Sequence, residues 1–310
     1  MATDEVLIIG ALAFDYIMRI GGRFAARLPD PQAAGFSAAF TVPSMRRAFG
    51  GCAGNIAFGL NLLGGSPLLM AAVGEDFSPY RDHLRRCGIS DLHVKTIGGA
   101  YTAQAFLASD DDESQIILFH PGASAEAHRQ SIGDLSAPPA MAIVSPNGRE
   151  AMLHFGRELA AAKTPFIFDP GQAIGLLAGE ELREILALCQ IAVFNQDEYE
   201  FCQKTAGDAR TGEKQTMIIT RGDAGSEAHT GGQTHRTTAA TFGKTADTTG
   251  CGDAYRAGLI YGLQREWKWP QILQFASVIA GVKAARQGGQ GYHITAAEAE
   301  AACRRIYGRA

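Results

Sequence analysis

The sequence predicts an α/β protein built on a mainly parallel β-sheet with helices on both faces. Short, continuous apolar runs recur along the chain, a pattern typical of strands that are buried on both sides. Helical patterns separate most of these runs, and many of the 37 glycines stand where a strand turns tightly into a helix. The expected strands are residues 5–10, 141–145, 166–169, 191–195 and 216–220.

Five further segments carry the apolar spacing of helices packed against such a sheet. In the last of them, Ile272, Phe275 and Ile279 recur at intervals of three and four residues, which places them on one helix face. The expected helices are residues 53–64, 148–163, 179–189, 253–265 and 269–286. Strands and helices thus alternate, as the connections of a parallel sheet require.

Residues 13–47 and 92–120 break this rhythm with short runs in which apolar and polar residues alternate. An acidic turn at residues 110–113 separates two such runs and is typical of a hairpin tip. We expect these stretches to form a small antiparallel sheet inserted into an α/β domain of residues 1–12, 48–91 and 121–310. The small sheet is placed to act as a lid over the carboxyl ends of the parallel strands, where ligands bind in open α/β sheets.

The composition argues against several classes of function. The chain has 310 residues, 46% of them hydrophobic, and its 28 basic and 32 acidic residues give a net charge of −4. Nucleic-acid binders and proteins of anionic membranes need a basic excess instead. There is neither an apolar run of about 18 residues, as a membrane span needs, nor the basic start of a signal peptide. We expect a soluble, cytoplasmic protein with no nucleic-acid or membrane partner.

Two kinds of motif that the sequence lacks argue against particular kinds of site. Six cysteines without a Cys-x-x-Cys pair predict free thiols, and no cysteine–histidine spacing indicates structural zinc. The first strand is followed by Gly10 alone and not by G-x-G-x-x-G, which argues against a dinucleotide-dependent oxidoreductase.

The most informative segment is residues 246–255, where Gly250, Cys251 and Gly252 stand at the predicted start of a helix. Small side chains there leave backbone N–H groups free to hold an anion, and the helix dipole adds to the attraction. Asp253 follows in the first turn, where a carboxylate repels phosphate but can accept a proton from an attacking hydroxyl. The alternative is a glycine-rich turn with Asp253 as an ordinary helix cap.

Two weaker segments contain candidate ligand-binding residues. In residues 50–55, Gly51 allows a close backbone approach to a ligand, and Asn55 can both donate and accept hydrogen bonds. Asp15 follows the first strand and could bind two neighbouring hydroxyl groups. A structural turn is the alternative for each of these segments.

Polar residues also follow two later strands. Asn195 and Glu198 could hold Mg²⁺ directly or through water, or could form a capping box at a helix start. Thr220, Gly222 and Gly225 follow the next strand in a glycine-rich turn.

Taken together and in this order, these segments resemble the ribokinase-like (PfkB) carbohydrate and nucleoside kinases over essentially the whole chain. Residues 247–253 resemble the family signature D-T-x-G-A-G-D, and residues 50–55 resemble its amino-terminal glycine motif. Residues 195–198 resemble its magnesium-associated N-x-x-E, and residues 220–225 its nucleotide-binding T-x-G-x-x-G. The resemblance implies a three-layer α/β/α domain with a small β-sheet lid.

Within that family the chain is most similar to nucleoside kinases of the adenosine kinase-like kind. This resemblance rests on stretches such as residues 13–18, 101–106, 115–122 and 168–172. It implies transfer of the γ-phosphate of Mg·ATP to the 5′-hydroxyl of a ribonucleoside, adenosine or a broader purine and pyrimidine set. A sugar kinase and a non-catalytic nucleoside-binding protein are the alternatives, and the chain is expected to be a monomer or a homodimer.

The resemblance also assigns roles to residues. Asp253 is the expected general base, and the amides of Gly250, Cys251 and Gly252 form the expected anion hole. Expected contacts to the nucleoside come from Asp15, Gly51, Asn55 and Phe106, to ATP from Asn195, Thr220, Gly222 and Gly225, and to water-bound Mg²⁺ from Asn195 and Glu198. Potassium, common in the family, would be held by backbone carbonyls near residues 247–249 and 284–291.

Cys251 departs from the family pattern, which usually has alanine at this position. Because a helix amino terminus lowers the pKa of a thiol, we expect Cys251 to be reactive and its modification to inactivate the protein.

Overall fold

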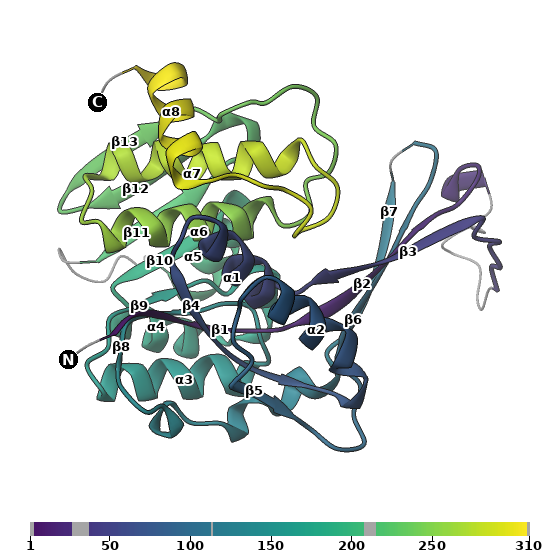
Figure 1. Ribbon diagram of the computed structural model, residues 1–310, viewed down its shortest axis with the longest axis horizontal. Helices are drawn as coiled ribbons and strands as arrows, with labels where there is room; N and C mark the ends of the chain where they lie inside the picture. The colour runs from purple at the N-terminus through teal and green to yellow at the C-terminus, as the bar shows by residue number, and fades with distance from the viewer. Residues whose placement is uncertain (1–2, 27–36, 113, 208–214, 309–310) are drawn as a thin grey trace.

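The computed structural model describes residues 3–26, 37–112, 114–207 and 215–308, and within them the strands form two sheets (Figure 1). The larger sheet has nine strands in the order β13-β12-β11-β10-β9-β8-β1-β4-β5. Its strands are parallel except at one edge, where β11, β12 and β13 pair antiparallel. They are β1 (Thr3–Ile9), β4 (Ser66–Val73), β5 (His93–Thr96), β8 (Pro139–Val144), β9 (Phe166–Phe168), β10 (Ile191–Asn195), β11 (Thr216–Thr220), β12 (Ser226–Thr230) and β13 (Gln233–Thr237).

Helices cover both faces of this sheet, and the sheet separates two hydrophobic cores. Along β1, Val6 and Ile8 belong to one core, while Leu7 and Ile9 belong to the other, because successive side chains of a strand point to opposite faces. The first core is closed by α1 (Cys52–Leu62), α2 (Ser78–Arg86), α6 (Cys251–Gln264), α7 (Trp269–Ala284) and α8 (Ala296–Tyr307). The second is closed by α3 (Arg149–Ala161), α4 (Gly179–Leu188) and α5 (Gln196–Ala206). The three-layer α/β/α arrangement confirms the predicted fold class.

The predicted elements lie within two or three residues of the observed ones, since each is marked by a long apolar pattern. Four strands of the larger sheet, β4, β5, β12 and β13, were not among the predicted runs. Short 3-10 turns complete the described chain at Phe24–Ala26, Glu75–Phe77, Gly122–Arg129, Ile132–Asp134, Gly171–Leu176 and Gly222–Ala224.

The second sheet is an arm that projects from the carboxyl-terminal edge of the larger sheet (Figure 1). It contains four strands in the order β3-β2-β6-β7, namely β2 (Ala13–Arg19), β3 (Ser44–Gly50), β6 (Ala103–Ser109) and β7 (Gln115–His120). The β6–β7 pair is antiparallel, as expected for a hairpin that turns at the acidic residues 110–112. We call this sheet the lid.

The lid differs from its prediction in two respects. It is mixed and not antiparallel, because β2 and β6 pair parallel to each other. Each of them follows a parallel strand of the larger sheet, β1 or β5, so both leave that sheet in the same direction.

Its boundaries also differ. Strand β5, expected in the lid, pairs with β4 in the larger sheet, so the second lid segment begins later than residue 92. Strand β3 runs on to Gly50, three residues past the expected boundary at residue 47, since its pairing with β2 continues to Ala13.

Candidate active site

The amino terminus of α6 presents backbone amides at the carboxyl edge of the larger sheet. Gly250 precedes the helix with φ +78°, a left-handed conformation that favours glycine, and a Cβ there would lie 2.9 Å from the Cα of Gly289. The amides of Gly250 and Gly252 have no acceptor among the described residues. The Cys251 amide, in contrast, already donates to the Thr248 carbonyl at 3.1 Å. Two of the three predicted anion-hole amides are thus free for a ligand.

Asp253 lies in the first turn of α6 and accepts a hydrogen bond from Asn55 of α1. The distance from Asn55 Nδ2 to Asp253 Oδ2 is 2.8 Å. Burial raises the pKa of Asp253 to about 6, although the Asn55 hydrogen bond and the Arg256 charge favour its ionised form. A carboxylate with a pKa just below neutrality is suited to general-base catalysis.

A second carboxylate, that of Asp15 on β2, lies within electrostatic reach of the first. Its pKa is raised to about 7, chiefly by burial and also by the negative charges of Asp253 and Asp247. The side chain is buried, yet none of the described residues donates a hydrogen bond to it. Gly50 makes room for it, because a Cβ at this position would lie 2.2 Å from Asp15 Oδ2. Both carboxylate oxygens are therefore available to a ligand.

Asn55 is held in place by a hydrogen-bond network that the sequence analysis did not identify. Gln290 Nε2 donates to Asn55 Oδ1 at 3.1 Å and to Tyr80 Oη at 2.8 Å. Tyr80 Oη in turn donates to the Gly50 carbonyl at 2.7 Å, and His83 Nε2 lies 2.7 Å from Gln290 Oε1. These residues are distant in sequence and belong to no recognisable motif, so only the tertiary structure reveals them.

A buried ion pair holds the start of α6 against the end of β9. Arg256, one helical turn after Asp253, donates through Nε and Nη2 to the two carboxylate oxygens of Asp169, each at 2.8 Å. The side chains of Arg256 and Asp169 are 7% and 2% exposed, so the pair is almost completely removed from water. Asp169 directly follows β9, and the pair therefore ties the start of α6 to the carboxyl edge of the sheet.

The glycine motif of residues 50–55 forms the junction between lid and domain. Gly51 caps α1 with φ +83°, and a Cβ there would lie 2.4 Å from the Ala11 carbonyl oxygen. This close approach brings the end of β1 and the start of α1 together beside Asp15. The motif thus positions two predicted ligand residues, Asp15 and Asn55, next to Asp253.

Phe106 is not brought together with these residues. It pairs with Tyr16 across β6 and β2, and the two rings stack with centroids 5.0 Å apart. Because Asp15 is the neighbour of Tyr16 in the strand, its side chain points to the other face of the lid. The expected contact of Phe106 with the nucleoside base stays a prediction.

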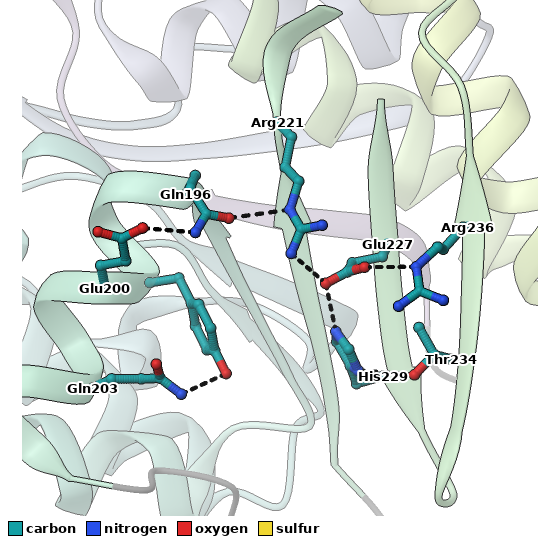
Figure 2. A network of polar contacts seen from close by, with 9 residues as sticks. Gln196, Glu200, Gln203, Arg221, Glu227, His229, Thr234 and Arg236 are labelled. Carbon is teal, nitrogen blue, oxygen red and sulfur yellow. Dashed lines mark hydrogen bonds and ion pairs between the residues drawn. The ribbon is translucent and has the colours of Figure 1, made fainter. Parts of the chain in front are cut away.

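The expected nucleotide turn follows β11 and is braced by a polar network (Figure 2). Gly222 and Gly225 have φ values of +53° and +93°, and a Cβ at Gly225 would collide with the Thr237 carbonyl oxygen. Arg221 donates to Gln196 Oε1 at 3.1 Å and to Glu227 Oε1 at 2.7 Å. Thr220 Oγ1 donates to the Phe194 carbonyl at 3.3 Å, which links β11 to β10.

Asn195 and Glu198 form the capping box that was the alternative to a metal site. Asn195 Oδ1 accepts from the Glu198 amide, and Glu198 Oε2 accepts from the Asn195 amide, each at 2.8 Å. Among the described residues, no group of three or more His, Cys, Asp or Glu side chains could hold a metal ion. Both Glu198 oxygens accept hydrogen bonds from Asn195, so the pair fits an ion bound through water better than one bound directly.

The surroundings of Cys251 bear on its expected reactivity. Burial raises the pKa of its thiol, and the charges of Asp247 and Asp253 raise it as well, whereas only Lys283 lowers it. Burial therefore acts against a thiolate at this position, and the expected reactivity of Cys251 stays a prediction.

Comparison with known proteins places this chain in a family. The family model described as "pfkB family carbohydrate kinase" matches residues 26–295. The chain belongs to this family. Like other pfkB kinases, it is a phosphotransferase with an alcohol group as acceptor.

Nucleoside kinases are prominent among its relatives. The structure of the Burkholderia thailandensis nucleoside kinase in complex with inosine is 37% identical, covers 98% of this chain and 99% of its own, and has a TM-score of 0.89. Another structure of that kinase, in complex with ADP-inosine, is 38% identical, covers 98% and 96%, and has a TM-score of 0.86. A Methanocaldococcus jannaschii nucleoside kinase is 27% identical over 83% of this chain and 82% of its own length.

None of the helices within the described residues is long and apolar enough to span a membrane.

Proposed function

We propose that this pfkB kinase transfers the γ-phosphoryl group of Mg·ATP to the 5′-hydroxyl of a ribonucleoside, with Asp253 as general base. The observation that carries the proposal is the position of the Asp253 carboxylate in the first turn of α6, beside the free amides of Gly250 and Gly252. The similarity to nucleoside kinases seen with inosine supports a nucleoside as acceptor, with adenosine within a broader purine and pyrimidine set.

In the proposed reaction the 5′-oxygen attacks the γ-phosphorus in line. A bond forms between these two atoms, the bond from the γ-phosphorus to the β,γ-bridging oxygen breaks, and ADP leaves. The hydroxyl proton passes to Asp253, and the free amides at the start of α6 stabilise the charge on the transferring phosphoryl oxygens.

The remaining residues orient the two substrates. Among the described residues, none donates a hydrogen bond to Asp15, so its carboxylate can accept hydrogen bonds from the ribose hydroxyls. The junction at Gly51 lets the ribose approach the backbone. Asn55 orients Asp253 and offers its second amide N–H to the ribose. Closure of the lid excludes water, which otherwise competes as phosphoryl acceptor.

The nucleotide is proposed to lie along the edge formed by the ends of β10 and β11. The turn from Thr220 through Gly222 to Gly225 leaves its backbone open to the nucleotide. Mg²⁺, which arrives with ATP, neutralises phosphate charge, and Asn195 and Glu198 hold its water ligands.

The test is ADP release from Mg·ATP across a panel of adenosine, inosine, guanosine, cytidine, ribose and fructose. We expect turnover with ribonucleosides and a loss on the order of 100-fold or more in kcat for Asp253→Asn, because the variant cannot accept the proton. Asp82→Asn, an exposed aspartate of α2, is the matched control and should keep wild-type kcat.

Three results would contradict parts of this proposal. Turnover with sugars alone would make the protein a sugar kinase with the same base. No turnover at all, in a protein that binds ATP, would favour a binding role. An Asp253→Asn variant as active as Asp82→Asn would remove Asp253 from its role.

Of the two oligomeric states expected, we infer the homodimer. Strand β7 is an edge of the lid, and Ile116, Ile117, Leu118 and Phe119 are all exposed on it. An unpaired, apolar edge strand is a template for pairing with another strand. A second copy of this chain presents the same apolar edge.

A further inference from the structure

Lys283, near the carboxyl end of α7, is completely buried behind the turn that leads into α6. Its side chain is 0% exposed, which is exceptional for a lysine. Nζ donates to the Asp247 carbonyl oxygen at 2.7 Å, and the nearest carboxylate oxygen, Oδ1 of the same residue, lies 4.0 Å away. Neither the proposed proton transfer nor the proposed ribose contacts use this residue.

The ammonium group is only partly satisfied. It carries three N–H donors, and the described residues supply one acceptor for them. The negative charges of Asp247 and Asp253 act favourably on the ammonium and the positive charge of Arg46 unfavourably, and its one acceptor belongs to the turn that precedes Gly250. Burying an unpaired donor and a charge is costly, and such a group is retained where a ligand or a fixed field makes use of it.

Asp247 connects Lys283 to the turn through hydrogen bonds. Its Oδ1 accepts from the Thr249 amide at 2.9 Å, inside the turn, and its Oδ2 accepts from the Gly288 amide at 2.7 Å. The Asp247 amide donates to the Ala284 carbonyl at 3.2 Å. The turn before Gly250 is therefore tied to the segment in which Lys283 lies.

The same geometry does not fit the potassium ion that the family resemblance implied. Within the segments expected to hold potassium, three backbone carbonyls, those of Asp247, Thr248 and Ala284, already accept hydrogen bonds from Lys283, Cys251 and Ala246. A monovalent cation at this position would also lie beside the Lys283 ammonium, and like charges repel.

We propose that Lys283 is a positioning residue that supplies, as a tethered ammonium, the fixed positive charge behind the anion-binding turn, so that turnover does not depend on a monovalent metal ion. The inference rests on the proposed phosphoryl transfer, in which negative charge gathers at the amides of Gly250 and Gly252. The ammonium supports the turn through its hydrogen bond to Asp247. Its positive charge offsets the negative charge that gathers at these two amides.

The experiment measures ADP release by the full-length protein with K⁺ replaced by Na⁺ or by N-methylglucamine at constant ionic strength. We expect wild-type kcat to agree within about twofold in all three salts. Lys283→Ala should lose about tenfold or more in kcat, as expected when a charge near a phosphoryl group is removed. Added K⁺ or methylammonium should restore several-fold of the loss by entering the space that the side chain leaves.

Two further variants separate charge from packing. Lys283→Met keeps most of the volume and should show a loss in kcat similar to that of Lys283→Ala, with and without K⁺, because no space for a cation is opened. Lys268→Ala removes an exposed lysine before the amino end of the same helix and should resemble wild type. Circular dichroism and the melting temperature identify variants that fold.

The proposal is overturned if wild type requires K⁺, if folded Lys283→Met keeps wild-type kcat, or if folded Lys283→Ala loses activity that no cation restores. A wild-type protein without turnover on any acceptor in any of the salts would instead contradict the proposed function. Binding of ATP to each variant, measured by calorimetry, shows whether the loss lies in nucleotide affinity or in the transfer step.

Discussion

Two aspartates at the junction of lid and domain owe their protonation behaviour to burial. Asp253 has a pKa of about 6 and Asp15 a pKa of about 7, both far above the ordinary value of 3.8. Desolvation is the largest cause for each, and the repulsion between the two carboxylates adds to it for Asp15. A ligand that donates hydrogen bonds to Asp15 would therefore relieve an unfavourable charge.

The pKa of Asp253 predicts the acid limb of the pH–rate profile. Because the general base and the proposed ribose acceptor Asp15 must both be ionised, kcat/KM for the nucleoside should rise with pH through both pKa values, about 6 and about 7. Initial rates of ADP release between pH 5 and pH 8 test this. A profile that stays flat between pH 5 and pH 7 would contradict the role of Asp253.

The raised pKa of Asp15 predicts a pH-dependent stability of the ligand-free protein. Between the ordinary value of 3.8 and the folded value of about 7, the native state binds more protons than the unfolded chain, so stability falls as pH rises. Asp15→Asn removes this effect and should raise the free energy of unfolding at pH 8 by on the order of 1–3 kcal/mol, with a smaller gain at pH 5.

Urea unfolding of wild type and Asp15→Asn at the two pH values checks this prediction, with Asp82→Asn as control. The same substitution should weaken nucleoside binding, because a carboxylate acceptor is lost. An equal change in stability at pH 5 and pH 8 would show that the Asp15 charge is not responsible.

At the level of helices and strands, the start of α6 is positioned by contacts from several parts of the sheet edge. The Asp169–Arg256 pair joins it to β9, the Asn55–Asp253 hydrogen bond joins it to α1, and Asp247 joins its leading turn to the segment after α7. These contacts bring residues from distant parts of the sequence to one point, as expected for a site on an open α/β sheet.

The buried pair predicts a large effect of single substitutions. Asp169→Asn leaves the Arg256 guanidinium without a counter-charge and should cost about 3–5 kcal/mol of stability. The double variant Asp169→Asn with Arg256→Met should recover part of this loss, because both charges are then gone. Urea unfolding in a double-mutant cycle measures the coupling, and a sum of two independent losses would contradict the pair's role.

For the molecule as a whole, the lid sheet combines a ligand-facing surface with an exposed apolar edge. Asp15 and its neighbour Gly50 lie at the base of the lid, while β7 lies at the edge away from β3. Pairing of β7 with a second copy would brace the lid on which Asp15 sits.

The dimer is tested by light scattering after size-exclusion chromatography. Wild type should have the mass of two chains, and Leu118→Lys should have the mass of one, because a charge on the paired edge opposes association. Leu92→Lys replaces an apolar residue that is 77% exposed outside the lid sheet and should remain dimeric. A monomeric wild type would refute the inference.

Local patterns were sufficient to predict the α/β class and the motif residues. The strands β1, β8, β9, β10 and β11 are buried on both faces, and each therefore has a continuous apolar sequence. This pattern can be recognised in each strand without knowing which strands it pairs with. Gly51 and Gly250 were predictable because a close approach of the backbone excludes a side chain there, while Gly50 and Gly252 make room for the side chains of Asp15 and Arg256.

Other features depended on contacts between distant residues. Strand β5 joined the larger sheet and β2 paired parallel with β6, because pairing is decided by neighbours in space and not by local alternation. Gln290, Tyr80 and Lys283 have no local signal of function, yet they orient or support Asp253 and its turn. The Cys251 thiol shows the same division, since a helix terminus can be predicted from the sequence, whereas the burial that raises the pKa of the thiol arises only when the chain is folded.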